Sequence, residues 1–258
     1  MDIPELRVDE TKREFPILLS MTDPDQTPQF LDTYDVILLD QGRTFMFELD
    51  RFGPDQDFHS TYLELGGGDL RQDQVQDLLV ECLSLLRSAY DDPSRQDDVP
   101  TPAEILDRLA PDISLPERMR LVDVVGWQEA GTISDAHAAT IRRLASSHPL
   151  GIVSNVWGPA HVFEENLARH GILDCFRIRT WSSDHRCVKP SHRLFEHALR
   201  QFDAPRDRIV YVGDDPGRDV PPAKNLGMGA VWIDHGTGER PPMAPDLVIH
   251  DLSELPDA

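Results

Sequence analysis

The stretch VILLDQGRTF, residues 36–45, decides the fold of this chain. Four apolar residues lead into Asp40, Thr44 follows four residues later, and a glycine stands at position 42. The apolar run predicts a strand that is buried on both faces, as in a parallel sheet. Such a strand would carry Asp40 to the carboxyl edge of the sheet, where open α/β folds place their ligand sites. Because an isolated aspartate there is more often a turn former or helix cap, its role depends on the rest of the chain.

Further apolar runs follow Pro149, namely LGIVSN (150–155), RIVYVGDD (208–215), GAVWID (229–234) and DLVIH (246–250). Helical patterns separate them. GPAHVFEENLARHG (158–171) ends on Gly171 as a C-terminal cap, and PSHRLFEHALRQF (190–202) opens with Pro190. A Pro-rich loop after Gly236 precedes the last short strand. This alternation predicts an α/β fold, a Rossmann-like three-layer parallel sheet with its strand ends on one edge.

Residues 50–132 read differently, since they contain helical patterns and no convincing strand. Helices are predicted in RQDQVQDLLVECLSLLRSAY (71–90), in TPAEILDRLA (101–110), which starts with a Thr-x-x-Glu capping box, and in PERMRLVDVVGWQEA (116–130). We therefore expect a helical domain at 50–132, inserted into a core domain formed by 34–49 and 133–258. Residues 1–33 are expected to be an N-terminal extension.

Composition excludes several classes of partner. The 258 residues carry a formal net charge of -21, which repels phosphate backbones and anionic lipid surfaces, so we expect neither nucleic acid nor membrane as a partner. No apolar segment approaches the ~20 residues of a membrane span, and the acidic N-terminal region is unlike a signal peptide. We expect a cytoplasmic protein. The three cysteines lack the spacing of a zinc site and are odd in number, which argues against a disulfide framework.

Polar residues at the predicted strand ends are the candidates for chemistry. Ser154 ends the second predicted strand, where its hydroxyl could hold an anionic oxygen, although it could equally cap the following helix. Lys189 precedes a helix-starting proline in a chain with only three lysines. Asp214 and Asp215, with Asp219 close behind, form an acidic group that suits Mg²⁺, whereas the alternative is an acidic turn.

Taken in order, DQGRT, VSN, KP and VGDDPGRDVPPAKNLGM resemble the motifs of the haloacid dehalogenase-like (HAD) superfamily, over Asp35 to about Asp234. The resemblance implies that Asp40 attacks phosphorus and that Thr44, Ser154 and Asn155 bind or orient the phosphoryl group. Lys189 would neutralise charge between the nucleophile and this group.

The resemblance also implies a Mg²⁺ cofactor and a cap. Asp40, Asp214 and the backbone carbonyl of residue 42 would ligate the ion, with Asp219 and Asp215 supporting the metal or Lys189. The helical insertion at 50–132 resembles the family's cap, which closes over the substrate and excludes water.

Position 42 departs from the family pattern Asp-x-Asp-x-Thr. The second aspartate normally protonates the leaving oxygen and then activates water, and Gly42 can do neither. General acid–base help is worth ~10²- to 10⁴-fold in rate, so an unassisted site should be slow on ordinary phosphate monoesters. Arg43 replaces the usual small residue and places a cation beside Asp40, so it is a candidate substrate-binding residue.

Three functions remain open at this stage. The favoured one is a Mg²⁺-dependent phosphatase-like hydrolase or phosphotransferase acting on a small phosphorylated metabolite, with weak or atypical turnover. Its missing acid would be supplied by another residue, for which Asp57 and His59 are candidates, or made unnecessary by a good leaving group such as an acyl phosphate. The second is an inactive HAD-like protein that binds a ligand or partner. The third is a metal-free haloacid dehalogenase, against which DQGRT together with GDD argues. Phosphonate cleavage by a cap lysine is excluded because no lysine lies between Thr44 and Lys189.

Overall fold

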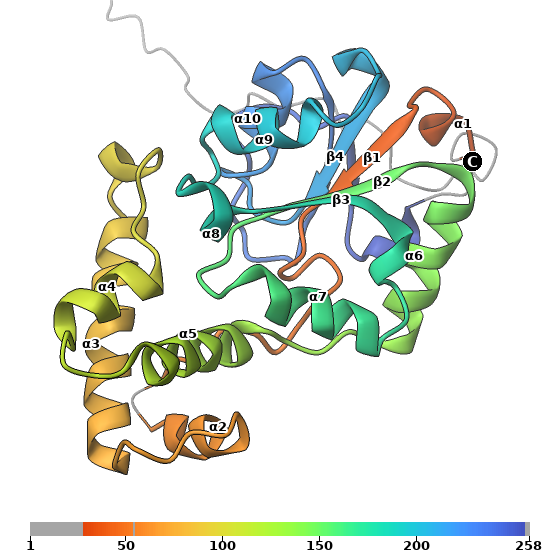
Figure 1. Ribbon diagram of the computed structural model, residues 1–258. Helices are drawn as coiled ribbons and strands as arrows, with labels where there is room; N and C mark the ends of the chain where they lie inside the picture. Colours follow the sequence, from red (N-terminus) through yellow and green to blue (C-terminus); the bar gives the residue numbers. More distant parts are fainter. Residues whose placement is uncertain (1–27, 54, 256–258) are drawn as a thin grey trace, which may run out of the picture.

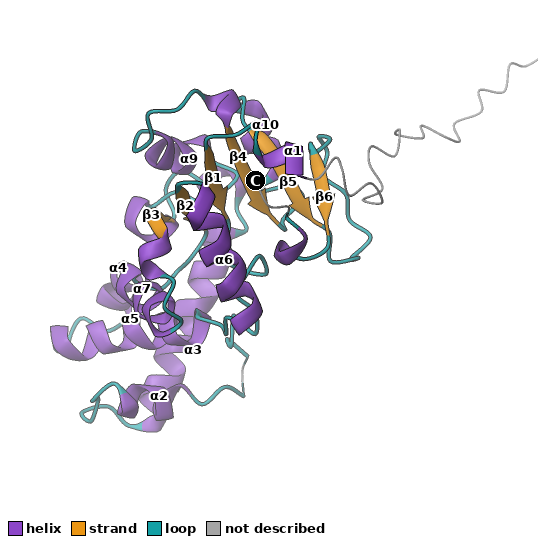
Figure 2. Ribbon diagram, turned by 90° about the vertical axis from the view of Figure 1, so that its right-hand side faces the viewer, coloured by secondary structure: helices purple, strands orange, loops and turns teal. Residues whose placement is uncertain are grey.

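The computed structural model describes residues 28–53 and 55–255. Its centre is a six-stranded sheet of parallel strands in the order β3-β2-β1-β4-β5-β6 (Figures 1 and 2). The strands are β1 (Val36–Leu39), β2 (Leu150–Ser154), β3 (Phe176–Trp181), β4 (Ile209–Gly213), β5 (Gly229–Ile233) and β6 (Leu247–Ile249). Most of the expected N-terminal extension, residues 1–27, lies outside the described residues, which begin with the short helix α1 (Pro28–Leu31).

Helices cover both faces of the sheet, which explains why β1 is apolar at every position. Ile37 and Leu39 point into one core layer with α6 (Asp135–Ser147) and α7 (Ala160–Arg169). Val36 and Leu38 point into the opposite layer with α9 (His192–Leu199) and α10 (Val220–Asn225) (Figure 1). The predicted three-layer α/β fold is confirmed. The remaining short helices are α8 (Ser182–His185), η2 (Leu173–Cys175), η3 (Arg206–Arg208) and η4 (Leu252–Glu254).

The segment between β1 and α6 forms a separate group of helices beside the sheet (Figure 2). They are α2 (Phe58–Glu64), α3 (Gln72–Tyr90), η1 (Pro93–Arg95), α4 (Pro102–Leu109) and α5 (Leu115–Glu129). These helices bury a hydrophobic cluster of their own. The three helices predicted here are confirmed as α3, α4 and α5. The capping box is present, because Thr101 Oγ1 accepts from the Glu104 amide at 3.3 Å and Glu104 Oε2 accepts from the Thr101 amide at 2.9 Å.

The five predicted strands are confirmed, and the structure adds one more. Strand β3 was not predicted because its sequence, FRIRTW, alternates apolar with basic residues, as suits an edge strand whose outer positions meet solvent. The cap at Gly171 is confirmed by its positive φ of 64°. The helix predicted from Pro190 begins instead at His192, because the Ser191 side chain accepts a hydrogen bond from the Arg193 amide and caps α9.

Parallel pairing brings the carboxyl ends of β1, β2 and β4 together. Leu39 pairs with both Ile152 and Val212, so β1 lies between the two strands that end at Ser154 and Gly213. The residues at or after these ends therefore meet at one edge of the sheet. Elsewhere in the part of the chain that the structure describes, Cys82, Cys175 and Cys187 are free thiols, and no helix there is long and apolar enough to cross a bilayer.

Candidate active site

Asp40 lies at the centre of the sheet edge. Its amide continues the β1–β4 ladder by donating to the Val212 carbonyl at 2.8 Å, which fixes the direction of the side chain. The carboxylate is buried, and its Oδ1 atom receives the Ser154 hydroxyl at 2.8 Å and lies 2.8 Å from the Lys189 ammonium. Both contacts fall on one oxygen. The other oxygen, Oδ2, is therefore the candidate nucleophile.

Lys189 is buried between two carboxylates. Its Nζ atom lies 2.8 Å from Asp40 Oδ1 and 2.7 Å from Asp219 Oδ1, and it donates to the Tyr211 hydroxyl at 2.9 Å. Burial by itself would lower the pKa of Lys189, but the charges of Asp219 and Asp40 outweigh it and hold the pKa above its ordinary value. Lys189 is therefore a fixed positive charge beside the candidate nucleophile.

Asn155 positions the backbone that carries this lysine. Its Oδ1 atom accepts from the Lys189 amide at 2.7 Å, and its Nδ2 atom donates to the Lys189 carbonyl at 3.2 Å. Nδ2 also donates to the Tyr90 hydroxyl at 3.0 Å, so α3 of the helical insertion contacts the same residue. Tyr211 completes the support, because its hydroxyl donates to the Val153 carbonyl at 2.8 Å. Neither tyrosine was predicted from the sequence, because both occupy ordinary apolar positions of a predicted helix and a predicted strand.

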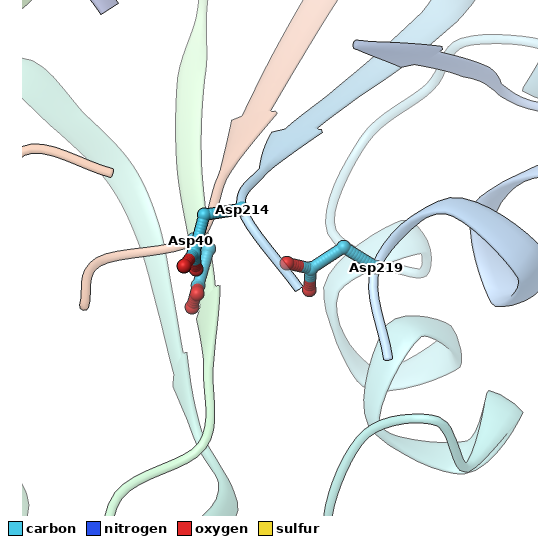
Figure 3. A group of neighbouring side chains, drawn as sticks. All are labelled: Asp40, Asp214 and Asp219. Carbon is cyan, nitrogen blue, oxygen red and sulfur yellow. The ribbon is translucent and has the colours of Figure 1, made fainter. Parts of the chain in front are cut away.

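Three carboxylates converge at the strand edge. Oxygens of Asp40, Asp214 and Asp219 lie within 4.8 Å of one another, with Asp40 and Asp214 side by side and Asp219 reaching toward them from the start of α10 (Figure 3). Burial and the nearby Asp40 charge raise the pKa of Asp214 to about 7. A cation would relieve this repulsion, and an all-oxygen donor set suits Mg²⁺, so the residues fit such an ion. Asp40 and Asp214 would hold it.

Asp219 and Asp215 have other partners. Asp219 is fully buried, and its oxygens accept from Lys189 and, at 2.8 Å, from the Asp215 amide, while its Oδ1 lies 3.2 Å from the Tyr211 hydroxyl. This makes it a support for Lys189. Asp215 is not one of the three clustered carboxylates. Its Oδ1 accepts from the amides of Gly217 and Arg218 at 2.8 and 2.9 Å, so its side chain caps the turn.

Arg43 lies against the candidate metal ligand Asp214, with its Nε atom 3.3 Å from the Asp214 Oδ2 atom. Its backbone has a φ of 53°, a left-handed conformation that disfavours side chains, whereas Gly42 is not in that region. A Cβ built on Gly42 would meet only the Leu49 methyl groups, at 3.7 and 3.8 Å. The turn therefore requires unusual geometry at position 43, and it leaves room for a side chain at position 42.

Two adjoining cavities open at this edge. The Asp40 cavity, about 260 Å³, is bordered by Asp40, Lys189 and Asp214. The Trp157 cavity, about 230 Å³, lies between Trp157 and the helical insertion. Both are lined by Gly42, Leu49, Asp50, Tyr90, Ser154 and Asn155.

Four residues singled out from the sequence line neither cavity, and they are Asp219, Thr44, Asp57 and His59. Thr44 is buried, and its hydroxyl has no hydrogen-bond partner among the described residues. Asp57 caps α2 by accepting from the Ser60 amide at 3.0 Å, and His59 stacks on Tyr62. The structure therefore gives no support to Asp57 or His59 as a substitute acid.

We expect Arg43→Gly to strengthen Mg²⁺ binding, because it removes the guanidinium that competes for Asp214 and suits the left-handed backbone. An exposed ion pair is worth ~0.2–1 kcal/mol, so the apparent Kd for Mg²⁺ should fall about 1.5- to 5-fold. The measurement is the rise in Tm with Mg²⁺ concentration, compared with Arg43→Lys, which keeps the charge. Identical titration curves for wild type and Arg43→Gly, or a Tm shift that survives Asp214→Asn, would contradict the assignment.

The chain matches one protein family and is similar to several known proteins. Residues 128–233 match the family described as haloacid dehalogenase-like hydrolase. The chain is 33% identical to a phosphoserine phosphatase of Thermus thermophilus over 123 residues, which cover 47% of this chain and 48% of the relative. It is 34% identical to a glyceraldehyde 3-phosphate phosphatase of Methanocaldococcus jannaschii over 95 residues, which cover 36% of this chain and 42% of the relative. The chain thus spans about half the length of the relatives it matches.

A solved structure extends the likeness of the fold over most of the chain. The 2-haloacid dehalogenase from Pseudomonas syringae superposes with a TM-score of 0.59 at 22% identity, over 86% of this chain and 96% of that one. At this level of identity the superposition shows a common fold.

Proposed function

This chain belongs to the haloacid dehalogenase-like superfamily, and on that premise we propose that it is a Mg²⁺-dependent phosphatase-like hydrolase or phosphotransferase of a small phosphorylated metabolite. The observation that carries the proposal is the Asp40 carboxylate, held through one oxygen by Ser154 and Lys189 beside Asp214. The two phosphatase relatives support a phosphorylated metabolite as the substrate class.

The chemistry divides into two displacements at phosphorus. In the first, Asp40 Oδ2 forms a bond to phosphorus while the bond to the leaving oxygen breaks, which leaves an aspartyl phosphate and a leaving group that needs a proton. In the second, water attacks the phosphorus of that adduct, gives up a proton and restores the carboxylate. A bound Mg²⁺ would supply positive charge that offsets the negative charges of the carboxylates and the phosphoryl group.

The chain's own residues would assist the first step more than the second. Lys189 offsets the charge that builds between Asp40 and the phosphoryl group, and the Ser154 hydroxyl lies close enough to Asp40 to meet the same group. Gly42 offers no proton donor and no base for water. We therefore expect leaving groups that need no proton, such as a carboxylate from an acyl phosphate, to react best.

We also propose that the helices of residues 50–132 act as a cap. Phe52, Tyr90 and Glu129 of this segment line the Trp157 cavity, which adjoins the Asp40 cavity. A lid in this place would exclude water from the phosphoryl group.

A non-catalytic binding role is the second candidate. The Arg43–Asp214 ion pair favours it, because it occupies a carboxylate that the metal would need. Metal-free dehalogenation is less favoured, because without a cation nothing would offset the repulsion between the Asp40 and Asp214 carboxylates, which helps to raise the pKa of Asp214.

Acetyl phosphate with Mg²⁺ should label Asp40, and the label should persist because Gly42 cannot activate water against it. Intact-mass and peptide mass spectrometry would locate one phosphoryl group. Asp40→Asn should abolish it, whereas Asp215→Asn, which changes a carboxylate outside the cluster, should keep it. Absence of any label on wild type would favour the binding role.

A further inference from the structure

The Trp157 cavity is acidic at a place where the leaving group of the substrate would lie. Three carboxylates line it, those of Asp50, Asp91 and Glu129, against the single basic side chain of Arg87. Asp50 lines the Asp40 cavity as well. A phosphoryl group beside Asp40 would therefore extend its leaving group past Asp50 into a region with more acidic than basic side chains.

Aromatic rings form the wall of the same cavity. Phe52 stacks on Trp157 with ring centroids 5.3 Å apart, and Tyr90 meets Trp157 edge-on at 6.0 Å. All three residues line the cavity. The faces of aromatic rings attract cations, so rings and carboxylates together favour a positively charged group over a neutral or anionic one.

Among the described residues that line the cavity, one buried acceptor lacks a donor and one buried carboxyl group lacks a basic partner. Gln41 is 1% exposed, and its Oε1 atom has no hydrogen-bond partner among the described residues. Glu129 is also buried, and burial together with the Asp50 charge raises its pKa to about 8. Its carboxylate accepts from the amides of Trp157 and Gly158, but no cation of the described residues pairs with it. Unsatisfied buried acceptors are costly, so a ligand with N–H donors would fit here.

We propose that the Trp157 cavity binds an ammonium group on the leaving group, so that the substrate is a phosphorylated compound that carries an amine a few bonds from the leaving oxygen. Asp50 and the aromatic wall would contact the charge, and the Gln41 amide oxygen would accept one of its N–H groups. This inference rests on the proposed function, because it takes the phosphoryl group to lie at Asp40.

Two non-hydrolysable ligands of equal size test the inference on the wild-type protein. With Mg²⁺ present, 3-aminopropylphosphonate should bind about 10-fold or more tightly than butylphosphonate, in which a methyl group replaces the ammonium. Isothermal titration calorimetry measures both dissociation constants. Equal binding of the two would overturn the inference while leaving the proposed function intact. Binding of neither would overturn the inference, and the proposed function would fall with it only if Asp40 also remained unlabelled by acetyl phosphate.

Variants identify the source of the preference. Asp50→Asn should bring the ratio of the two constants close to one, and asparagine suits the backbone there, since Asp50 has a φ of 58°. Phe52→Leu should reduce the ratio partly. Glu48→Gln is the matched control, because Glu48 is an exposed carboxylate two residues away that lines neither cavity. A preference that survives Asp50→Asn, or that is lost in Glu48→Gln, would also overturn the inference.

Discussion

Lys189→Met should lower the free energy of unfolding by about 3–5 kcal/mol, because it leaves buried carboxylates without their counter-charge. The Lys189 side chain is almost fully buried and contacts Asp40 and Asp219 at 2.8 and 2.7 Å. Urea unfolding followed by circular dichroism would measure the loss. The same variant should lose labelling of Asp40 by acetyl phosphate, since the charge beside the nucleophile is gone.

The matched control is Lys224→Met. The Lys224 ammonium lies 2.7 Å from an Asp246 carboxylate oxygen, and both side chains are partly exposed. Loss of this ion pair should therefore lower the free energy of unfolding by ~1 kcal/mol or less. Adding Asp219→Asn to Lys189→Met should recover part of the stability by removing one uncompensated charge. If the two lysine variants unfold at the same urea concentration, Lys189 does not supply the counter-charge that stabilises the buried Asp40 and Asp219 carboxylates.

Gly42→Asp should raise the hydrolysis of an aryl phosphate by about 10-fold or more and shorten the life of the Asp40 adduct. The new carboxylate would supply a general acid and base, which is worth ~10²- to 10⁴-fold in a complete site. Two features of the structure favour its accommodation. Gly42 has no positive φ, and a Cβ there meets only Leu49 at ordinary contact distance. Initial rates and the decay of the labelled protein by mass spectrometry would measure both effects.

Arg43 is the remaining obstacle, since its guanidinium could pair with the new carboxylate as it does with Asp214. The double variant Gly42→Asp with Arg43→Gly removes that partner and should show the larger gain. Gly42→Asn is the matched control, because it adds nearly the same volume without an acid. A gain in Gly42→Asn equal to that in Gly42→Asp, or none in the folded double variant, would show that a missing acid does not limit turnover.

Much of the fold could be read from local patterns. The run Val36–Leu39 is apolar at every position because both faces of the strand are covered, and such runs predicted five of the six strands in the described chain. Strand β3 was not predicted, because an edge strand in which arginines alternate with apolar residues lacks that pattern. Helix α4 was marked by its own capping box, a signal that acts over three residues.

The identities of the central site residues also followed from sequence, because parallel strands deliver their carboxyl ends to one edge whatever lies between them. That reasoning brought Asp40, Ser154 and Asp214 to one place, and the motif order added Lys189. It also suggested that Asp215 supports the metal or Lys189 and that Asp57 or His59 supplies an acid. In the structure these residues cap or pack local turns and helices, contacts set by backbone geometry that the motif order does not specify.

Only the tertiary structure revealed the backbone conformation at Gly42 and Arg43 and the residues that line the Trp157 cavity. A glycine is compatible with either sign of φ, so its presence could not reveal that Arg43 is the residue with the left-handed conformation. The cavity joins Asp50, Arg87, Glu129 and Trp157, which come from distant parts of the chain. Strand and helix patterns arise from the neighbours of each residue along the chain, whereas a cavity's charge depends on how the helical insertion packs against the sheet, and no local pattern encodes that packing.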